Sequence, residues 1–212
     1  MRIKKLKITS LTGHFGEVLG IDDRRTHDTP PPSTVIGILR VLYGEDINNF
    51  VFGYTFKSEV KYKDDISIYK HSKDGTVREK NKPKSDCRFI ENHAECELLI
   101  YTNISNIMTI NYMLCMGKSG NPARLHFPIQ EIDLIQKEGQ GFNQYTPKHI
   151  GTGVIKPTNL VTNFDNLLGS YRAQVSHLRL NSKFDYNKNY DNEEQHNIFL
   201  WEIKNGEVRV YD

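Results

Sequence analysis

The residues of this chain best suited to chemistry are basic side chains beside glycines, not acidic pairs or metal ligands. Gly117-Lys118-Ser119 forms a short motif whose backbone amides and lysine suit a phosphate group. A Walker-type loop needs a further glycine five residues before Gly-Lys-Ser, and that position holds Tyr112. We therefore interpret the motif as a turn that contacts phosphate but is not a nucleotide-binding loop. An ordinary surface turn is the alternative.

Motifs for metal binding and nucleophilic catalysis are missing from the sequence. The eight histidines form no His-Glu-x-x-His motif, and no cysteine–histidine spacing suits zinc. No Gly-x-Ser-x-Gly elbow supports a serine nucleophile. We predict no metal, no cofactor and no catalytic residue. RNA cleavage by tyrosine, lysine and histidine needs no metal and leaves no compact motif, so it stays open.

A second basic group lies in an unusually long loop over residues 11–29. Arg24, Arg25 and His27 stand near the end of this aperiodic segment. Loops of this length inside a compact domain are uncommon unless they serve a function or are mobile. The loop leads into a helix, and a helix N-terminus favours anions. We predict that these three residues face RNA.

The helix itself is marked at both ends. Pro30-Pro31-Pro32 holds the chain extended before it, Ser33 is the predicted N-cap, and Gly44 is the predicted stop. Ser33 and Thr34 at its start are predicted to meet phosphate.

One face of this helix is apolar. Val35, Ile36, Leu39 and Leu42 recur at helical spacing, which predicts a core-facing helix. Gly37 costs about 1 kcal/mol relative to alanine inside a helix, so we expect a neighbouring element to approach closely there.

A long basic hairpin is predicted over residues 60–101. Strand-like segments at 50–56 and 60–69 precede the Asp74-Gly75 turn signal, and a core strand at 97–101 closes the excursion. Residues 70–88 hold seven basic side chains against three acidic ones. With Tyr62, Tyr69 and Phe89 interleaved, the hairpin suits a phosphate backbone and stacked bases. A hairpin that lysines merely keep soluble is the alternative.

The remaining segments give weaker signals. Residues 2–9 alternate as a strand, with Lys5 and Lys7 on one face that is either nucleic-acid binding or the solvated side of an edge strand. Residues 104–116 are ambiguous between helix and strand, and 129–135 is a predicted strand. The polar region 139–197 includes a predicted mobile loop at 185–197. A type I′ hairpin around Asn205-Gly206 ends the chain.

Composition limits the class of protein. The chain has 212 residues, 37% apolar content and a net charge of +2, so any nucleic-acid binding depends on local patches. Its three cysteines form no Cys-x-x-Cys pair, and the amino terminus is not signal-like. No apolar run reaches membrane-spanning length. We expect a cytoplasmic protein with no membrane partner.

The order of these features resembles a known family. The segment Thr29-Pro30-Pro31-Pro32-Ser33-Thr34-Val35-Ile36-Gly37-Ile38-Leu39, a basic β-excursion and then Gly117-Lys118-Ser119 resemble CRISPR-associated protein 5 over residues 1–125. This is the small RNA-binding subunit of type I Cascade complexes. The length and short C-terminal region look most like type I-B members.

The resemblance implies an α+β fold. Its parts are a ferredoxin-like (RRM-related) core, a long basic β-hairpin thumb and a β-rich C-terminal part. We expect residues 1–135 to form the core, with the hairpin inserted at about 60–101, and 136–212 to form a variable extension. It also implies a subunit that binds the repeat-derived 5′ handle of the CRISPR RNA and caps the foot of the complex. Its partners there are a backbone subunit, the large subunit and target DNA near the protospacer-adjacent motif.

The predicted RNA-binding residues are basic or hydroxyl-bearing. They are Arg24, Arg25, His27, Ser33, Thr34, Lys70, Arg78, Lys80, Lys82, Lys84, Arg88, Lys118, Ser119 and Arg124. One branch of the family, type I-C, cuts precursor RNA with a tyrosine, a lysine and a histidine. Tyr43 and Lys118 stand in comparable places, but Ser119 replaces the histidine, so we favour a binding subunit over a metal-independent endoribonuclease. A pure protein-interaction module is the third hypothesis.

Overall fold

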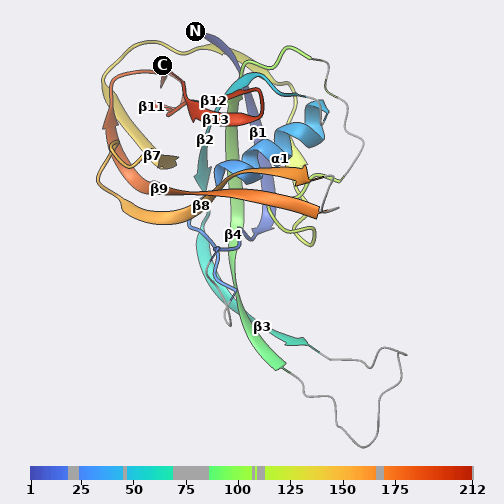
Figure 1. Cartoon of the computed structure of the whole chain (residues 1–212). Helices are drawn as coiled ribbons and strands as arrows, with labels where there is room; N and C mark the ends of the chain where they lie inside the picture. Colours follow the sequence, from blue (N-terminus) through green and yellow to red (C-terminus); the bar gives the residue numbers. More distant parts are fainter. Residues whose placement is uncertain are drawn as a thin grey trace, which may run out of the picture.

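The chain folds as a strongly β-rich α+β protein, seen in a computed structural model (Figure 1). The structure describes residues 1–18, 24–44, 47–68, 86–106, 108, 113–165 and 170–211. Within these ranges there is one α-helix, α1 (Pro32–Tyr43). The strands are β1 (Arg2–Gly13), β2 (Phe50–Lys57), β3 (Val60–Ile68), β4 (Asp86–Thr102), β5 (Arg124–Leu125), β6 (Gln130–Asp133), β7 (Gly139–Thr146), β8 (Val154–Asp165), β9 (Ser170–Tyr186), β10 (Tyr190–Asp191), β11 (His196–Asn197), β12 (Trp201–Lys204) and β13 (Glu207–Val210).

The main sheet places its strands in the order β13-β12-β2-β4-β1-β5, with β6 also pairing β1 and β3 pairing β4. Both β1 and β2 run antiparallel to the intervening β4, so α1 is a crossover between two parallel strands. This is the order expected for the first half of a ferredoxin-like core. The described residues contain no second helix, however, so the ferredoxin-like detail is not confirmed.

Helix α1 begins earlier than the sequence suggested. Pro31, with φ −64° and ψ 154°, is the N-cap, and Pro32 is the first helical residue, so the predicted N-cap Ser33 is wrong. Proline suits the first helical position because its missing N–H would be unpaired there anyway. The Pro31 carbonyl accepts from the amide of Thr34 at 2.9 Å. Gly44 ends the helix with φ 103°, and its N–H donates to the Arg40 carbonyl at 2.8 Å.

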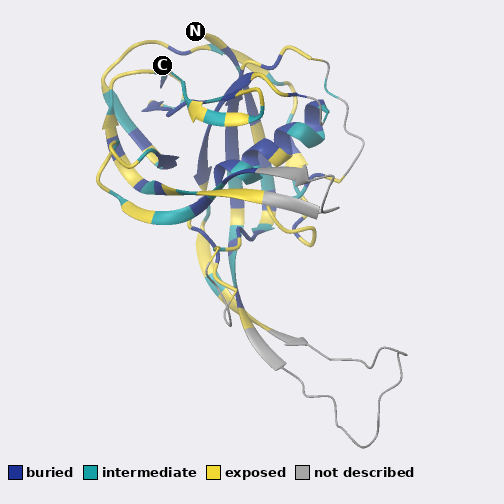
Figure 2. Cartoon of the chain, viewed as in Figure 1, coloured by how far each residue is buried: buried dark blue, intermediate teal, exposed yellow. Residues whose placement is uncertain are grey.

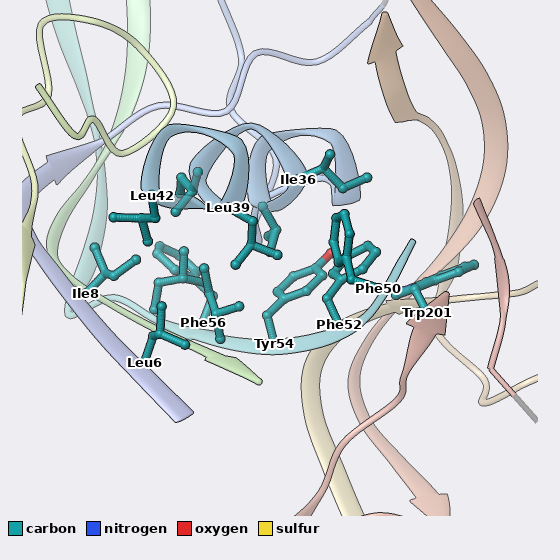
Figure 3. Close-up of a cluster of buried hydrophobic side chains, with 14 of the residues drawn as sticks. Leu6, Ile8, Ile36, Leu39, Leu42, Phe50, Phe52, Tyr54, Phe56 and Trp201 are labelled. Atoms are coloured by element: carbon teal, nitrogen blue, oxygen red, sulfur yellow. The ribbon is translucent and has the colours of Figure 1, made fainter. Parts of the chain in front are cut away.

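The predicted apolar face of α1 forms the centre of the core. Val35, Ile36, Leu39 and Leu42 are all at most 1% exposed. They pack on side chains of β1 and β2, among them Leu6, Ile8, Phe50, Phe52, Tyr54 and Phe56 (Figure 3). Each such aliphatic or aromatic side chain stabilises the fold by about 1.5–3 kcal/mol relative to an exposed position.

Gly37 lies on the exposed side of α1, contrary to prediction. A Cβ atom at Gly37 would meet nothing within 4 Å, so no element approaches closely there. The expectation failed because a glycine in a helix indicates that space is available without saying what fills it.

The two lysines on one face of β1 differ in burial. Lys5 is only 5% exposed, and its ammonium lies 2.9–3.3 Å from carboxylate oxygens of Asp191, Glu193 and Glu194. Lys7 pairs with Glu97 at 2.5 Å. Because β1 lies between β4 and β5, the predicted edge strand is wrong. Lys5 is buried in ion pairs, whereas the Lys7 side chain is 49% exposed, so RNA binding at Lys7 stays a prediction.

The segment 185–197, predicted to be a mobile loop, packs against the main sheet instead. Asp191, His196 and Asn197 are at most 4% exposed. The hydroxyl of Tyr101 on β4 donates to Asp191 at 3.0 Å, and β10 pairs with β11. Asp191, Glu193 and Glu194 of this segment therefore bind Lys5 of the sheet, where composition alone predicts solvent.

The predicted hairpin is present and projects from the body of the protein (Figure 1). β3 pairs with the first half of the 17-residue β4, from Val60↔Ala94 to Ile68↔Asp86, while the second half of β4 lies between β1 and β2. The described residues of β3 in this stem are mostly exposed, while residues 90–94 of β4 are buried or intermediate (Figure 2). The Asp74-Gly75 turn lies outside the described residues.

The C-terminal part contributes two units. β7, β9 and β8 form a separate three-stranded sheet, and β12 extends the main sheet beside β2. Asn205 and Gly206 have φ values of 53° and 81° between β12 and β13, which confirms the two-residue turn. The predicted strand at 129–135 is present as β6, and the described residues of 104–116 lie in no helix. The division at residue 135 stays a prediction.

Candidate nucleic-acid interface

The Gly117-Lys118-Ser119 turn is held tightly against the end of β1. Gly117 has φ 86°, and a Cβ atom there would overlap the carbonyl oxygen of His14. The His14 amide donates to the Met116 carbonyl at 3.2 Å, and the Asn121 amide closes the turn onto the Lys118 carbonyl at 2.9 Å. Lys118 and Ser119 are exposed. A glycine is therefore required here, and the next two residues are presented to solvent.

The same turn faces the N-terminal half of α1 across a small hollow. Thr34, Gly37, Ile38 and Val41 line one wall of this space of about 270 Å³, and Met113–Cys115 and Gly117 line the other. Thr34 at the helix start and Gly117 of the glycine turn, which are far apart in sequence, thus line the same space. We call it the α1 hollow. Its apolar residues, such as Ile38 and Val41, suit the face of a base, and Thr34 suits a neighbouring phosphate.

Arg24 lies between this turn and the hairpin. Its amide donates to the Phe89 carbonyl at 3.0 Å, and the Glu91 amide donates to the Arg24 carbonyl at 2.9 Å, so the segment runs along the stem of β4. Burial lowers the pKa of His14, and the positive charges of Lys118 and Arg24 lower it further. Both cations therefore act on the same histidine from nearby. Their side chains extend from an exposed surface.

His27, in contrast, is not a surface residue. Its side chain is 1% exposed, Nδ1 lies 2.6 Å from the Tyr145 hydroxyl, and its carbonyl lies 2.8 Å from Nε2 of His93. Burial lowers the pKa of His27 to about 4, so the ring is neutral at neutral pH. The structure therefore buries His27, while Arg24 and Arg25 of the same loop are exposed.

Above His27 lies a pocket that we call the His27 pocket, with a volume of about 340 Å³. Its polar lining is Glu17, Arg25, His27, Lys61, Glu91 and Lys156. Lys61 bonds to Asp28 at 3.0 Å and to Glu91 at 3.3 Å. Lys156 lies 2.9 Å from Glu17 and 3.7 Å from the other oxygen of Asp28. An alternating chain of charges therefore joins the 11–29 loop to the hairpin stem and to β8.

Arg124 lines neither the α1 hollow nor the His27 pocket. Arg124 lines a large groove of about 1130 Å³ whose charged residues are mainly acidic. They are Asp28, Glu59, Glu95 and Glu97 against Lys57 and Arg124. A lining with this charge balance disfavours a phosphate backbone, so Arg124 has less support as an RNA contact than Lys118. Ser33 is half-buried in the first turn of α1.

Part of the predicted set cannot be placed. Lys70, Arg78, Lys80, Lys82 and Lys84 lie outside the described residues. Arg88 belongs to β4 opposite Ile66, and only its backbone is described. The basic tip of the hairpin therefore stays a prediction.

Sequence reasoning missed the residues around His27. Lys61 and Tyr145 had no local signal, because their partners are distant in sequence: Lys61 reaches Thr26 across 35 positions and Tyr145 reaches His27 across 118. Lys156 likewise pairs with Glu17 across 139 positions. Such a lysine in a strand has the same sequence pattern whether it is solvated or paired.

Tyr43, named for the ribonuclease alternative, belongs to the core. It is 6% exposed, and its buried hydroxyl has no hydrogen-bond partner in the part of the chain that is described. A role in cleavage would require the core to open there. Over the described ranges, no cluster of three or more His, Cys, Asp or Glu side chains is arranged to hold a metal ion. No described helix is long and apolar enough to cross a membrane.

No family model matches the sequence, and no curated protein matches it. Solved structures do match the fold. A chain of a structure described as "CRISPR RNA-guided surveillance complex" has a TM-score of 0.51 at 12% identity, covering 86% of this chain and 91% of that one. A chain of "Cryo-EM structure of the Type III-B Cmr-beta bound to cognate target RNA and AMPPnP, state 1" has a TM-score of 0.51 at 11% identity, covering 87% and 86%.

A third match is more distant. It is "Crystal structure of a CRISPR protein from Archaeoglobus fulgidus", with a TM-score of 0.39, 10% identity and 98% coverage of both chains. At such low identities, the two matches with a TM-score of 0.51 show a shared fold.

Proposed function

We propose that this protein is an RNA-binding subunit of a CRISPR RNA-guided surveillance complex, of the CRISPR-associated protein 5 kind. It binds the repeat-derived 5′ handle of the CRISPR RNA and caps the foot of a type I complex. One observation supports this most: Gly117 and Thr34 line the same hollow, so the glycine turn and the helix start form a single site.

The chemistry of that site suits single-stranded RNA. Lys118 and the exposed amides of its turn neutralise a phosphate, and the first turn of α1 adds its partial positive charge. Met113, 69% exposed at the opposite wall, offers a polarisable surface to a base. Arg24 extends the cationic surface toward the hairpin stem, along which the RNA backbone continues.

The shared fold gives independent support. Both structures with TM-scores of 0.51 are described as RNA-guided or RNA-bound assemblies. By this analogy we propose that the chain works in the cytoplasm beside a backbone subunit and the large subunit, near target DNA at the protospacer-adjacent motif. The type I-B assignment belongs to the same proposal.

Binding to labelled handle RNA tests this function. We expect a shifted complex at low salt whose affinity falls steeply as salt rises, because phosphate contacts release counterions. No binding of the handle RNA at low salt would contradict the proposed function.

We further propose that the chain binds RNA without cutting it. Incubation of labelled precursor RNA with the protein in EDTA should leave the RNA intact. A defined cleavage product would instead show that the protein is a metal-independent endoribonuclease. If charge reversal at Lys80, Lys82 and Lys84 blocks assembly but spares RNA binding, the hairpin is a protein-docking element.

A further inference from the structure

We infer that the His27 pocket binds one unstacked nucleobase that bears an exocyclic amino group. The inference rests on the proposed RNA-binding function and adds a base-reading subsite to it. The pocket joins Glu17 and His27 of the 11–29 loop to Glu91 on the hairpin stem. Arg24 pairs with Ile90 of the same stem, and the neighbouring Arg25 lines the pocket, so we place the path of the RNA from the Lys118 turn past the mouth of the pocket.

An unsatisfied atom points to a missing ligand. Nε2 of His27 is buried and has no hydrogen-bond partner among the residues that the structure describes. Buried polar atoms are nearly always paired, so such an exception calls for an explanation. Tyr145 holds Nδ1 at 2.6 Å and thereby fixes the orientation of the ring. The other ring nitrogen is covered by the surrounding side chains in the free protein, so a base reaches it only when the pocket widens.

The lining of the His27 pocket combines apolar and polar side chains, as the faces and the edge of a base require. Val18 and Pro157 give the pocket apolar surface for the faces of a base. At about 340 Å³ the space lies at the small end of ligand pockets, which suits a single nucleoside. Unstacked bases of single-stranded RNA are recognised by their hydrogen-bonding edges in such sites.

The carboxylates that line the pocket favour a base with an exocyclic amino group. Glu17 and Glu91 each bond a lysine through one carboxylate oxygen, and a carboxylate has further lone pairs for an N–H donor. Cytosine and adenine place an amino donor beside a ring nitrogen acceptor, so the amino group meets a carboxylate and the ring nitrogen meets His27 or a lysine. Uracil presents a carbonyl where the amino group would be, and that oxygen would face a carboxylate.

Short fluorescein-labelled oligoribonucleotides of cytidine, uridine or adenosine test the inference with the full chain at low salt. Cytidine against uridine is the decisive comparison, because the rings have the same size. We expect cytidine to bind at least about fivefold more tightly, the lower end of what paired hydrogen bonds to a base edge give. Glu17→Gln and His27→Asn should each bring that ratio close to one.

Lys118→Gln is the matched control, since it should weaken all three RNAs while keeping their ratio. If His27→Asn does not fold, Glu17→Gln still decides, because that side chain is partly exposed and the substitution keeps its size. Equal binding of cytidine and uridine by the native chain would overturn the inference, and so would a preference that survives Glu17→Gln. If the native chain binds none of the RNAs, the proposed function itself fails.

Discussion

The backbone at Gly117 lies so close to the carbonyl oxygen of His14 that no side chain fits between them. This contact fixes the turn that presents Lys118, and it ties that turn to the end of β1. Since φ at Gly117 is 86°, the position excludes a side chain both by conformation and by space. The predicted phosphate contact is thus held by the main sheet.

Gly117→Ala should therefore destabilise the protein and misplace Lys118. We expect a loss of about 1–3 kcal/mol in the free energy of unfolding, from backbone strain and overlap with His14. Denaturant unfolding measures this, and RNA binding should weaken in parallel. Gly120→Ala in the same turn is the control, because a Cβ there meets nothing within 4 Å. Equal effects of the two substitutions would contradict the role given to Gly117.

Gly37→Ala should raise the free energy of unfolding while it weakens RNA binding. A Cβ at this exposed helical position meets nothing within 4 Å, so alanine should stabilise the protein by about 0.5–1 kcal/mol. The added methyl enters the α1 hollow, and RNA affinity should fall. A stabilised variant that binds RNA as well as the native chain would show that the hollow takes no ligand.

Lys5→Met should be severely destabilising, because it leaves buried Asp191 without its cation. The side chains of Lys5 and Asp191 are 4% and 1% exposed, and breaking such a pair costs about 3–5 kcal/mol. Arg2→Met is the matched control on the same strand. Its ion pair with Glu131 is exposed, so we expect a change of about 0–1 kcal/mol in thermal or denaturant unfolding. A loss for Lys5→Met as small as that for Arg2→Met would contradict the role given to the buried pair.

Acid should weaken the fold well above the range where carboxylates titrate. Burial lowers the pKa of His27 from 6.5 to about 4. As the pH falls below 6.5, His27 takes up a proton in the unfolded chain before it does so in the folded one. Its contribution to the free energy of unfolding is therefore complete above pH 6.5 and is lost progressively down to about pH 4. This histidine alone contributes roughly 3 kcal/mol to that loss.

Other groups set the shape of this pH profile. Burial lowers the pKa of His14, His93 and His196 in the same direction. The pKa of Asp191 is also lowered, against the cost of its burial, by hydrogen bonds and by Lys5, so its contribution persists to lower pH. Unfolding measured from pH 7 to 4 should show a steady loss that is smaller in His27→Asn. Constant stability over that interval would contradict the burial of these rings.

Local signals predicted much of the fold. The Leu6–Ile8 alternation, the apolar face of α1 and the positive-φ pair Asn205-Gly206 depend on neighbouring residues, and each is confirmed. The N-cap was misplaced because Ser33 follows a proline that itself starts the helix. The Lys118 turn was found from its motif, but its placement against α1 needed the structure.

Interactions between distant residues could not be predicted. Lys5 and Glu193 are 188 positions apart, and a strand lysine gives no sign of whether it is solvated or buried in an ion pair. The His27 pocket assembles in the same way, from the 11–29 loop, the hairpin stem and β8. The sequence pattern of a helix or strand predicts on which face of that element a side chain lies. It does not predict which other element packs against that face.

The salt dependence of handle-RNA binding, compared between the native chain and Lys118→Gln, tests the RNA-binding site most directly. For the native chain we predict that the logarithm of the binding constant falls linearly with the logarithm of salt concentration. Loss of one phosphate contact in Lys118→Gln should make that slope shallower by about 0.7–1. Identical slopes for the two proteins, or no binding by the native chain at low salt, would contradict a phosphate contact at Lys118.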